Sequence, residues 1–269
     1  MPTTNRLLQV NVHDQKSFAI IGNLLKVKVL FKDIDVAAWW RAHENDEAGF
    51  FHDEAGGIFA GAVVSVDCGK CLDSVTIDTM AQELSKMSTE YCVISSGNAL
   101  VWDRMGGGAE YMKKIMRKQK GKGFMLPLCS IRPTEQKRAR SAMSADGHWV
   151  LGHALAPNAS QEMNFYNPYA IGPKDDERRI IGGMYQDANG AAGGELKWNF
   201  YNGCVHQTTK SDCWVYLLIE VMRVLLLLTD KQATECRKGI KGVRRAFAAY
   251  MMLKYDAAED KNSKRKRGV

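Results

Sequence analysis

The segment that most constrains the fold is residues 213–228, where fourteen apolar residues are interrupted only by Glu220 and Arg223. A helix that is apolar on nearly all sides has to be buried in a core. The run is too short and too interrupted to span a bilayer, so it predicts an interior helix. Asp212 stands where a helix cap is expected. Because the N-terminus of a helix carries partial positive charge, a cysteine at position 213 is favoured as the thiolate.

The composition is typical of a soluble globular protein. The chain has 269 residues, 45% of them hydrophobic and 25% charged, which is enough for one sizeable core. The first sixteen residues are mixed polar and do not resemble a secretory signal. Seven cysteines, an odd number, favour free thiols in a reducing, intracellular compartment.

The net charge of +7 comes mainly from the last nine residues, which hold five of the lysines and arginines. Without these five charges the chain carries only +2, so we expect no nucleic-acid binding except through this tail. Residues 257–269 are predicted as a disordered basic tail. The cluster Lys264-Arg265-Lys266-Arg267 is typical of a nuclear import signal or of a solubilising arm.

Metal binding is not predicted. Cys68 and Cys71 have the spacing of half a zinc site, but no second pair of cysteines or histidines completes the ligand set.

Alternating and helical apolar patterns predict a mixture of strands and helices. The final helix is expected to end near residue 255. The expected strands are residues 24–31, 58–66, 91–94, 124–131, 148–155 and 163–166, and the expected helices are residues 34–43, 72–84, 109–118 and 213–228.

Four residues together suggest a thiol active site. A cysteine nucleophile needs a base, a group that orients the base, and donors for the oxyanion. His148 begins one strand of a predicted hairpin and Asn167 follows the other, so the hairpin can bring them together. Gln207 lies six positions before Cys213. Each residue alone is more often a packing residue, so the prediction depends on their joint occurrence.

The order of these residues resembles the SUMO-protease family, the ubiquitin-like-protein-specific proteases of clan CE, whose wider clan includes the adenovirus proteinase. The resemblance covers residues 72–255. It is carried by His148-Trp149-Val150-Leu151, by Tyr166-Asn167-Pro168 at the family's acidic position, and by Gln207 six residues before Asp212-Cys213-Trp214. Residues 72–77 and 240–245 are similar to the family's opening and closing helices.

This resemblance implies an α+β fold with a mixed central sheet, flanked by helices, and a nucleophile at the start of a buried helix. Residues 71–256 would be the catalytic domain and residues 1–70 an N-terminal extension. The protein would be a monomer whose partner is a ubiquitin-like modifier or its conjugates, and it would need no cofactor. The site residues implied are His148 as base, Asn167 as its orienter, Gln207 as oxyanion donor, Cys213 as nucleophile, and Trp149, Trp214 and Asp73 as substrate contacts.

Three departures from the family pattern leave alternatives open. Asn167 replaces a carboxylate, Trp214 replaces the glycine after the nucleophile, and Cys71 replaces a tryptophan of the opening motif. The primary hypothesis is a protease that cleaves after the small-residue tail of a modifier or at a polyprotein site. The alternatives are an inactive modifier-binding module and an acetyltransferase of the same clan.

Overall fold

The structure is a computed structural model. It describes residues 11–43, 50–53, 56–67, 70, 72, 74–117, 122–130, 148–155, 161–189, 195–200, 207, 209 and 211–266. Asp73 and the two cysteines of the 68–71 motif therefore lie outside the described residues. In the part of the chain that is described, no helix combines the length and the hydropathy needed to cross a membrane.

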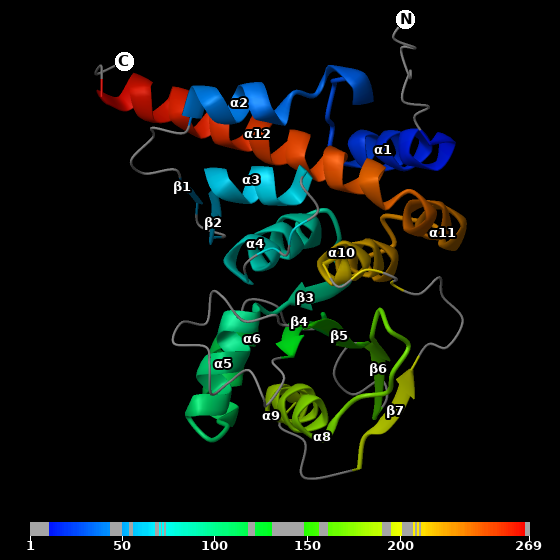
Figure 1. Cartoon of the computed structure of the whole chain (residues 1–269). Coiled ribbons are helices and arrows are strands. Elements are labelled where there is room, and N and C mark those ends of the chain that lie inside the picture. The colour runs from blue at the N-terminus through cyan, green and yellow to red at the C-terminus, as the bar shows by residue number, and fades with distance from the viewer. Residues whose placement is uncertain are drawn as a thin grey trace, which may run out of the picture.

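A five-stranded mixed sheet forms the centre of the fold (Figure 1). Its strands, in spatial order, are β3 (Tyr91–Val93), β4 (Gly123–Ser130), β5 (His148–Ala154), β6 (Glu162–Tyr166) and β7 (Lys197–Phe200). β4, β5 and β6 are antiparallel neighbours, whereas β3 and β7 run parallel to β4 and β6. The predicted hairpin of residues 148–166 is confirmed by the pairing of Leu151 with Tyr166.

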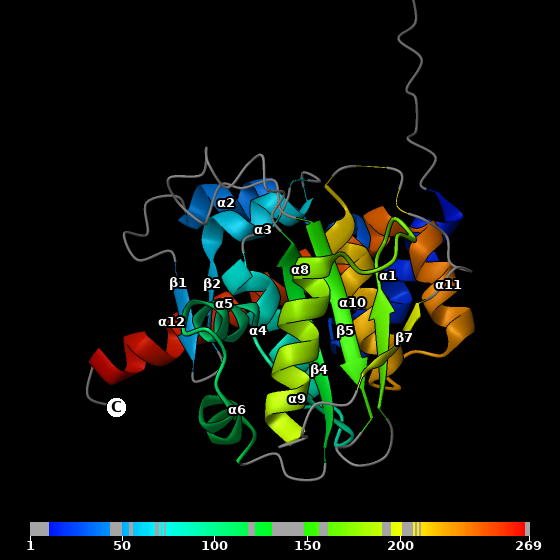
Figure 2. The ribbon, with the colours of Figure 1, turned by 90° about the horizontal axis from the view of Figure 1, so that it is seen from below.

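Helices cover both faces of the sheet, because its strands alternate apolar residues between two hydrophobic clusters. Trp149 and Leu151 pack toward α4 (Ser74–Ser85) and α10 (Cys213–Val224), whereas Val150 belongs to the opposite cluster. That second face carries α5 (Ser96–Arg104), α6 (Ala109–Met116) and α9 (Gly183–Asn189). Figure 2 shows α9, which continues from α8 (Asp175–Glu177) through a π turn, η2 (Arg178–Gly182), lying over β4 and β5.

A further layer of helices lies beyond α4 and α10 (Figure 1). It contains α1 (Val12–Leu24), η1 (Phe31–Asp33), α2 (Val36–His43), α3 (Ala60–Asp67), α11 (Asp230–Lys238) and α12 (Ile240–Lys266), with the hairpin of β1 (Phe50–Asp53) and β2 (Gly56–Phe59) at its side. Gly242 of α12 lies so close to α1 that a Cβ there would be 1.8 Å from the carbonyl oxygen of Asp14. Phe18 and Ile21 of α1 share one core cluster with α10 and α12, so the predicted N-terminal extension packs as part of the same core.

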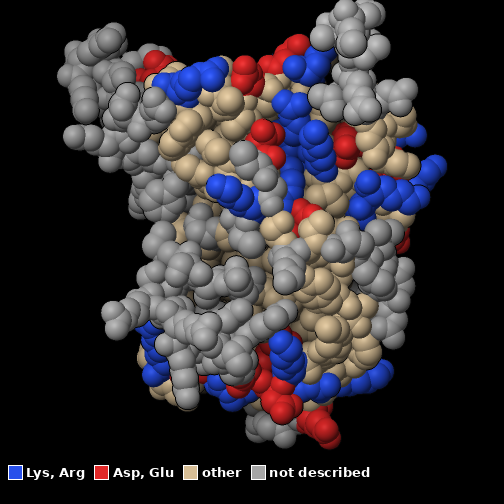
Figure 3. Space-filling model, in the orientation of Figure 1, with Lys and Arg blue, Asp and Glu red and all other residues tan. Residues whose placement is uncertain are grey.

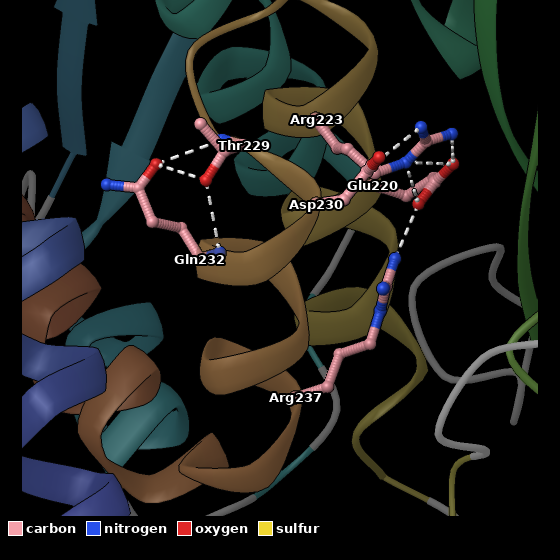
Figure 4. Close-up of polar contacts among 6 residues, drawn as sticks. All are labelled: Glu220, Arg223, Thr229, Asp230, Gln232 and Arg237. Carbon is pink, nitrogen blue, oxygen red and sulfur yellow. Dashed lines mark hydrogen bonds and ion pairs between the residues drawn. The ribbon is translucent and has the colours of Figure 1, made fainter.

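Helix α10 is buried as predicted, since every one of its residues except Arg223 is buried. Its one buried charge, Glu220, is satisfied by two arginines (Figure 4). Oε1 of Glu220 accepts from Arg223 at 2.6 Å, and Oε2 accepts from Arg237 of α11 at 2.6 Å. This ion cluster joins α10 to α11.

Two predicted strands are wrong. Residues 24–31 contain no strand, because α1 continues to Leu24 and ends in a left-handed turn at Lys26 with φ of 58°. The amide of Val27 closes that turn by donating to the carbonyl of Gly22 at 2.8 Å, the bond that commonly ends a helix. Residues 58–66 form the end of β2 followed by α3, in which Val63 and Val66 are buried at helical spacing.

The predicted end of the last helix is also wrong. α12 extends to Lys266, so residues 257–266, predicted as a disordered arm, are helical. Contacts with α2 support this helix beyond residue 254. The indole of Trp39 packs edge-on against Tyr255, and its Nε1 donates to Asp256 at 2.9 Å.

Charges of both signs are mixed on the face shown in Figure 3. This arrangement fits the near-neutral charge of the chain without its last nine residues.

Candidate active site

The β5–β6 hairpin brings His148 and Asn167 into direct contact. Nε2 of His148 lies 2.7 Å from Oδ1 of Asn167, and Asn167 is buried. The same oxygen accepts the backbone N–H of Tyr169 at 2.9 Å. Asn164, on the same hairpin, instead lies on β6 opposite His153, and the orienting role of Asn167 stays a prediction.

These bonds determine which ring nitrogen of His148 can act as a base. Because the N–H of Tyr169 donates to Oδ1, that atom is the amide oxygen and can only accept. Nε2 of His148 must therefore carry the proton that it shares with Asn167. In the neutral imidazole the other nitrogen, Nδ1, is then the acceptor.

The plane of the imidazole is held by Tyr169. The two rings stack with centroids 4.6 Å apart and an interplanar angle of 26°. Tyr169 follows Asn167-Pro168 in a tight turn, in which the amide of Ala170 donates to the carbonyl of Asn167 at 2.8 Å. Tyr169 was not among the site residues predicted from the sequence, although it lies only two residues after Asn167.

Gln207 lies beside this turn. Its backbone N–H donates to the carbonyl of Pro168 at 3.0 Å, and its side chain is buried. Nε2 donates to the carbonyl of Thr209, which the hydroxyl of Tyr169 also approaches at 3.5 Å. An amide nitrogen has two N–H groups, and the predicted role of Gln207 as an oxyanion donor would use the second.

Cys213 is the first residue of α10 and is not part of a disulfide. The backbone N–H groups of the first helical turn have no acceptor within the helix, and a role for the Cys213 amide as an oxyanion donor stays a prediction. The residue itself is buried, with 2% of its surface exposed. Thr209 connects Cys213 to Gln207, because the Thr209 hydroxyl donates to Asp212, the residue before Cys213.

Asp212 is not the side-chain cap that the sequence predicts. Its carboxylate makes no capping bond to α10. It pairs with Arg244 of α12 instead, whose Nε donates to Oδ1 at 2.8 Å. Competition from a buried guanidinium therefore overrides the usual capping role, and Arg244 is a second residue that sequence reasoning did not include in the site.

The two tryptophans predicted as substrate contacts are core residues in the structure. Trp214 is 1% exposed, its Nε1 donates to the carbonyl of Lys70 at 3.2 Å, and its indole packs against Phe247 of α12. Its contact with a substrate stays a prediction. Trp149 is 3% exposed in the same cluster, and a role for it at the substrate stays a prediction. Asp73 lies outside the described residues.

Two other cysteines are poor competitors for the nucleophilic role. Burial raises the pKa of the Cys92 thiol to about 11 and that of the Cys236 thiol to about 12, so both are protonated at neutral pH. Among the residues that the structure describes, no three histidine, cysteine or acidic side chains are grouped as a metal site would require.

Comparisons with known proteins identify the fold. No model of a protein family and no curated protein sequence matches the chain. Three similar solved structures are the SUMO protease Ulp1 with its catalytic cysteine oxidised to a sulfenic acid, the C-terminal Ulp1 protease domain in complex with Smt3, the yeast ortholog of SUMO, and the catalytic domain of the Chaetomium thermophilum Ulp1-like SUMO protease.

The similarity extends over most of each chain at low sequence identity. The first structure is 14% identical with a TM-score of 0.58, covering 86% of this chain and 97% of its own. The second is 13% identical with a TM-score of 0.58, covering 84% and 95%. The third is 13% identical with a TM-score of 0.51, covering 80% and 88%. The chain therefore has the α+β fold of the Ulp1-like SUMO proteases.

Proposed function

We propose that the chain is a cysteine protease that hydrolyses the peptide or isopeptide bond after the small-residue tail of a ubiquitin-like modifier. The observation that carries this proposal is the 2.7 Å contact between His148 Nε2 and Asn167 Oδ1, in a fold whose α10 begins at Cys213. The similar Ulp1 domain was solved in complex with Smt3, an ortholog of SUMO, which supports a SUMO-type modifier as the first substrate to test.

The first half of the reaction forms a thioester. Nδ1 of His148 takes the proton from Sγ of Cys213, and the sulfur attacks the carbonyl carbon of the scissile bond. The negative oxygen accepts from the remaining Nε2–H of Gln207 and from the Cys213 amide. When the intermediate collapses, His148 gives its proton to the departing amine, which leaves the modifier tail bonded to sulfur.

The second half releases the product. His148 removes a proton from water, the resulting hydroxide attacks the thioester carbonyl, and the thiolate departs. The modifier leaves with a free carboxylate and the enzyme regains its thiol. Asn167 keeps Nε2 protonated throughout, as a neutral orienting group that supports the imidazolium less than a carboxylate does.

Cleavage of a SUMO precursor tests the proposal. The wild type should release the residues that follow the diglycine tail, and His148→Ala should lose this activity by about three orders of magnitude or more. His13→Ala is the matched control, because His13 lies half exposed on α1 and bonds to Glu235; it should cleave like the wild type.

Other outcomes would favour the alternatives. Tight binding of the modifier without cleavage would indicate an inactive binding module, for which the replacement of a carboxylate by Asn167 is the motivation. Binding of acetyl-CoA would favour an acetyltransferase.

We also propose that residues 264–267 act as a nuclear import signal. Their composition is the support for this proposal. Deletion of residues 261–269 should change the distribution of a tagged protein in eukaryotic cells without changing its turnover of substrate; an unchanged distribution would refute it.

A further inference from the structure

A buried arginine of α12 binds the chain immediately before the nucleophile. Arg244 is 4% exposed, and all three guanidinium nitrogens donate. Nε donates to Asp212 Oδ1 at 2.8 Å, and Nη2 donates to the same oxygen and to the carbonyl of Ser211 at 3.2 Å. Nη1 donates to the carbonyls of Val66 at 3.1 Å and Lys70 at 3.3 Å. The five N–H groups of the guanidinium thus make five contacts.

These contacts hold three segments in a fixed relation. Val66 belongs to α3 and Lys70 follows it, Ser211 and Asp212 precede α10, and Arg244 belongs to α12. The ring of Trp214 lies under the guanidinium, with its centroid 5.0 Å from Cζ. The residues on both sides of Cys213 are therefore in contact with the same arginine.

The charge of Arg244 matters as much as its geometry. The Asp212 carboxylate is adjacent in sequence to Cys213, and a nearby negative charge disfavours the ionised form of a thiol. A guanidinium bonded to that carboxylate cancels most of its field. The side chain of Asp212 is only 14% exposed, so water would compensate for the loss of Arg244 incompletely.

We propose that Arg244 is a positioning residue for the nucleophile. It fixes the backbone that carries the Cys213 amide and thiol, and it neutralises the carboxylate beside them. The kinetic consequence rests on the proposed protease function, whereas the effect on thiol ionisation does not.

A purely structural role for Arg244 is the competing explanation, and Arg245 provides the matched control. Arg245 is the next residue of α12 and has similar contacts. Its Cζ lies 4.7 Å from the centroid of the Phe31 ring, and its guanidinium donates to the backbone carbonyl of Ile34. It pairs with Asp67 at 3.7 Å. None of these partners lies beside Cys213 in the sequence, so Arg245→Met should reduce thermal stability while leaving kcat and the pH profile unchanged.

Steady-state cleavage of a SUMO precursor between about pH 5 and 9 separates the two effects. Arg244→Met should lower kcat about 10–100-fold, with a smaller change in KM, and should move the acidic limb of the rate profile to higher pH. Arg244→Lys keeps the charge but not the five-donor geometry, so kcat should fall while the acidic limb stays near its wild-type position. Adding Asp212→Asn to Arg244→Met should move the limb back.

Ionisation of the thiol provides a readout that requires no substrate. The ultraviolet absorbance of a thiolate, taken as the difference between each protein and its Cys213→Ala counterpart, should appear at higher pH in Arg244→Met than in the wild type. If the wild type cleaves nothing, the proposed function fails, and this titration still decides the role of Arg244. If Arg244→Met does not fold, Arg244→Lys and Asp212→Asn carry the test.

The inference is overturned if the folded Arg244 variants and Arg245→Met give the same kcat and the same thiol titration. It is supported if Arg244→Met changes both measurements, Arg244→Lys changes kcat alone, Arg245→Met changes neither, and Asp212→Asn reverses the shift in pH.

Discussion

Removing the buried charge of Glu220 should destabilise the protein strongly. The perturbation is Glu220→Gln, which keeps the shape of the side chain. Glu220 is 1% exposed and Arg237 is 4% exposed, so neither group can exchange its partner for bulk water. Arg223 has a second partner in Asp230, at 3.3 Å, but Arg237 Nε already makes no bond among the described residues. The amide of a glutamine would also direct N–H donors at guanidinium donors.

The magnitude follows from the cost of leaving one charge of a buried pair alone, about 3–5 kcal/mol. Against a total stability of about 5–15 kcal/mol for a typical domain, this is a large fraction. For a domain of this size it corresponds to a decrease in Tm of about 6–20 °C.

Thermal and urea unfolding at neutral pH measure the effect. The matched control is Glu162→Gln, because Glu162 pairs with Lys197 at 2.8 Å on the exposed edge of β6 and β7, where an ion pair adds little stability; its Tm should match the wild type. The double variant Glu220→Gln/Arg237→Met removes the orphaned cation and should be more stable than Glu220→Gln alone. If Glu220→Gln costs no more than Glu162→Gln, the ion cluster does not hold α10 against α11 as the distances indicate.

Three further predictions concern the sheet, the helix layer and the site. Burial, and to a smaller extent the charge of Arg223, lowers the pKa of His153 from 6.5 to about 3, so the unfolded chain binds a proton that the folded chain excludes. The free energy of unfolding should therefore fall by up to about 1.4 kcal/mol for each unit by which the pH is lowered from about 6.5 to 3. His153→Gln should reduce this slope in urea titrations. Gly242→Ala should lower the free energy of unfolding by about 1–3 kcal/mol because of the close approach to Asp14. Gly61→Ala in α3, with no atom within 4 Å of the added Cβ, should leave Tm unchanged or raise it. Equal melting temperatures of the two variants would contradict the close crossing of α12 and α1. Asn167→Asp should maintain or raise kcat/KM, because a carboxylate stabilises the imidazolium better than an amide does, and a large loss would show that the amide itself is required.

Sequence reasoning succeeded where local pattern and long-range contact coincide. The alternation of residues 148–155 and the turn residues that follow were sufficient to predict the hairpin, and the hairpin register brings Asn167 to His148. The predominantly apolar character of residues 213–228 was sufficient to predict that α10 is buried.

The failures have two physical causes, a helix end that was not recognised and contacts between distant segments. Val27 and Val29 suggested a strand, but their conformation is set by the left-handed turn at Lys26 that ends α1. Asp212 suggested a cap, but Arg244, 32 positions away, binds its carboxylate. No local pattern indicates which buried arginine will reach a given carboxylate.

The end of α12 shows the same limit. Residues after 255 are polar and suggested a disordered arm, yet Trp39 of α2 bonds to Asp256 and supports the helix there. Charge and composition described the segment correctly, but its conformation depends on a helix more than two hundred positions away in the sequence.

The most direct test of the central claim, that Cys213 is the nucleophile of a modifier-specific protease, is intact-mass analysis after incubation with SUMO carrying a C-terminal vinyl sulfone. The wild type should gain the mass of one modifier, peptide mapping should place the bond on Cys213, and His148→Ala should react far more slowly. Cys213→Ala should gain no mass while keeping the wild-type Tm within a few degrees. An adduct on another cysteine, or an equal adduct on Cys213→Ala, would contradict the claim.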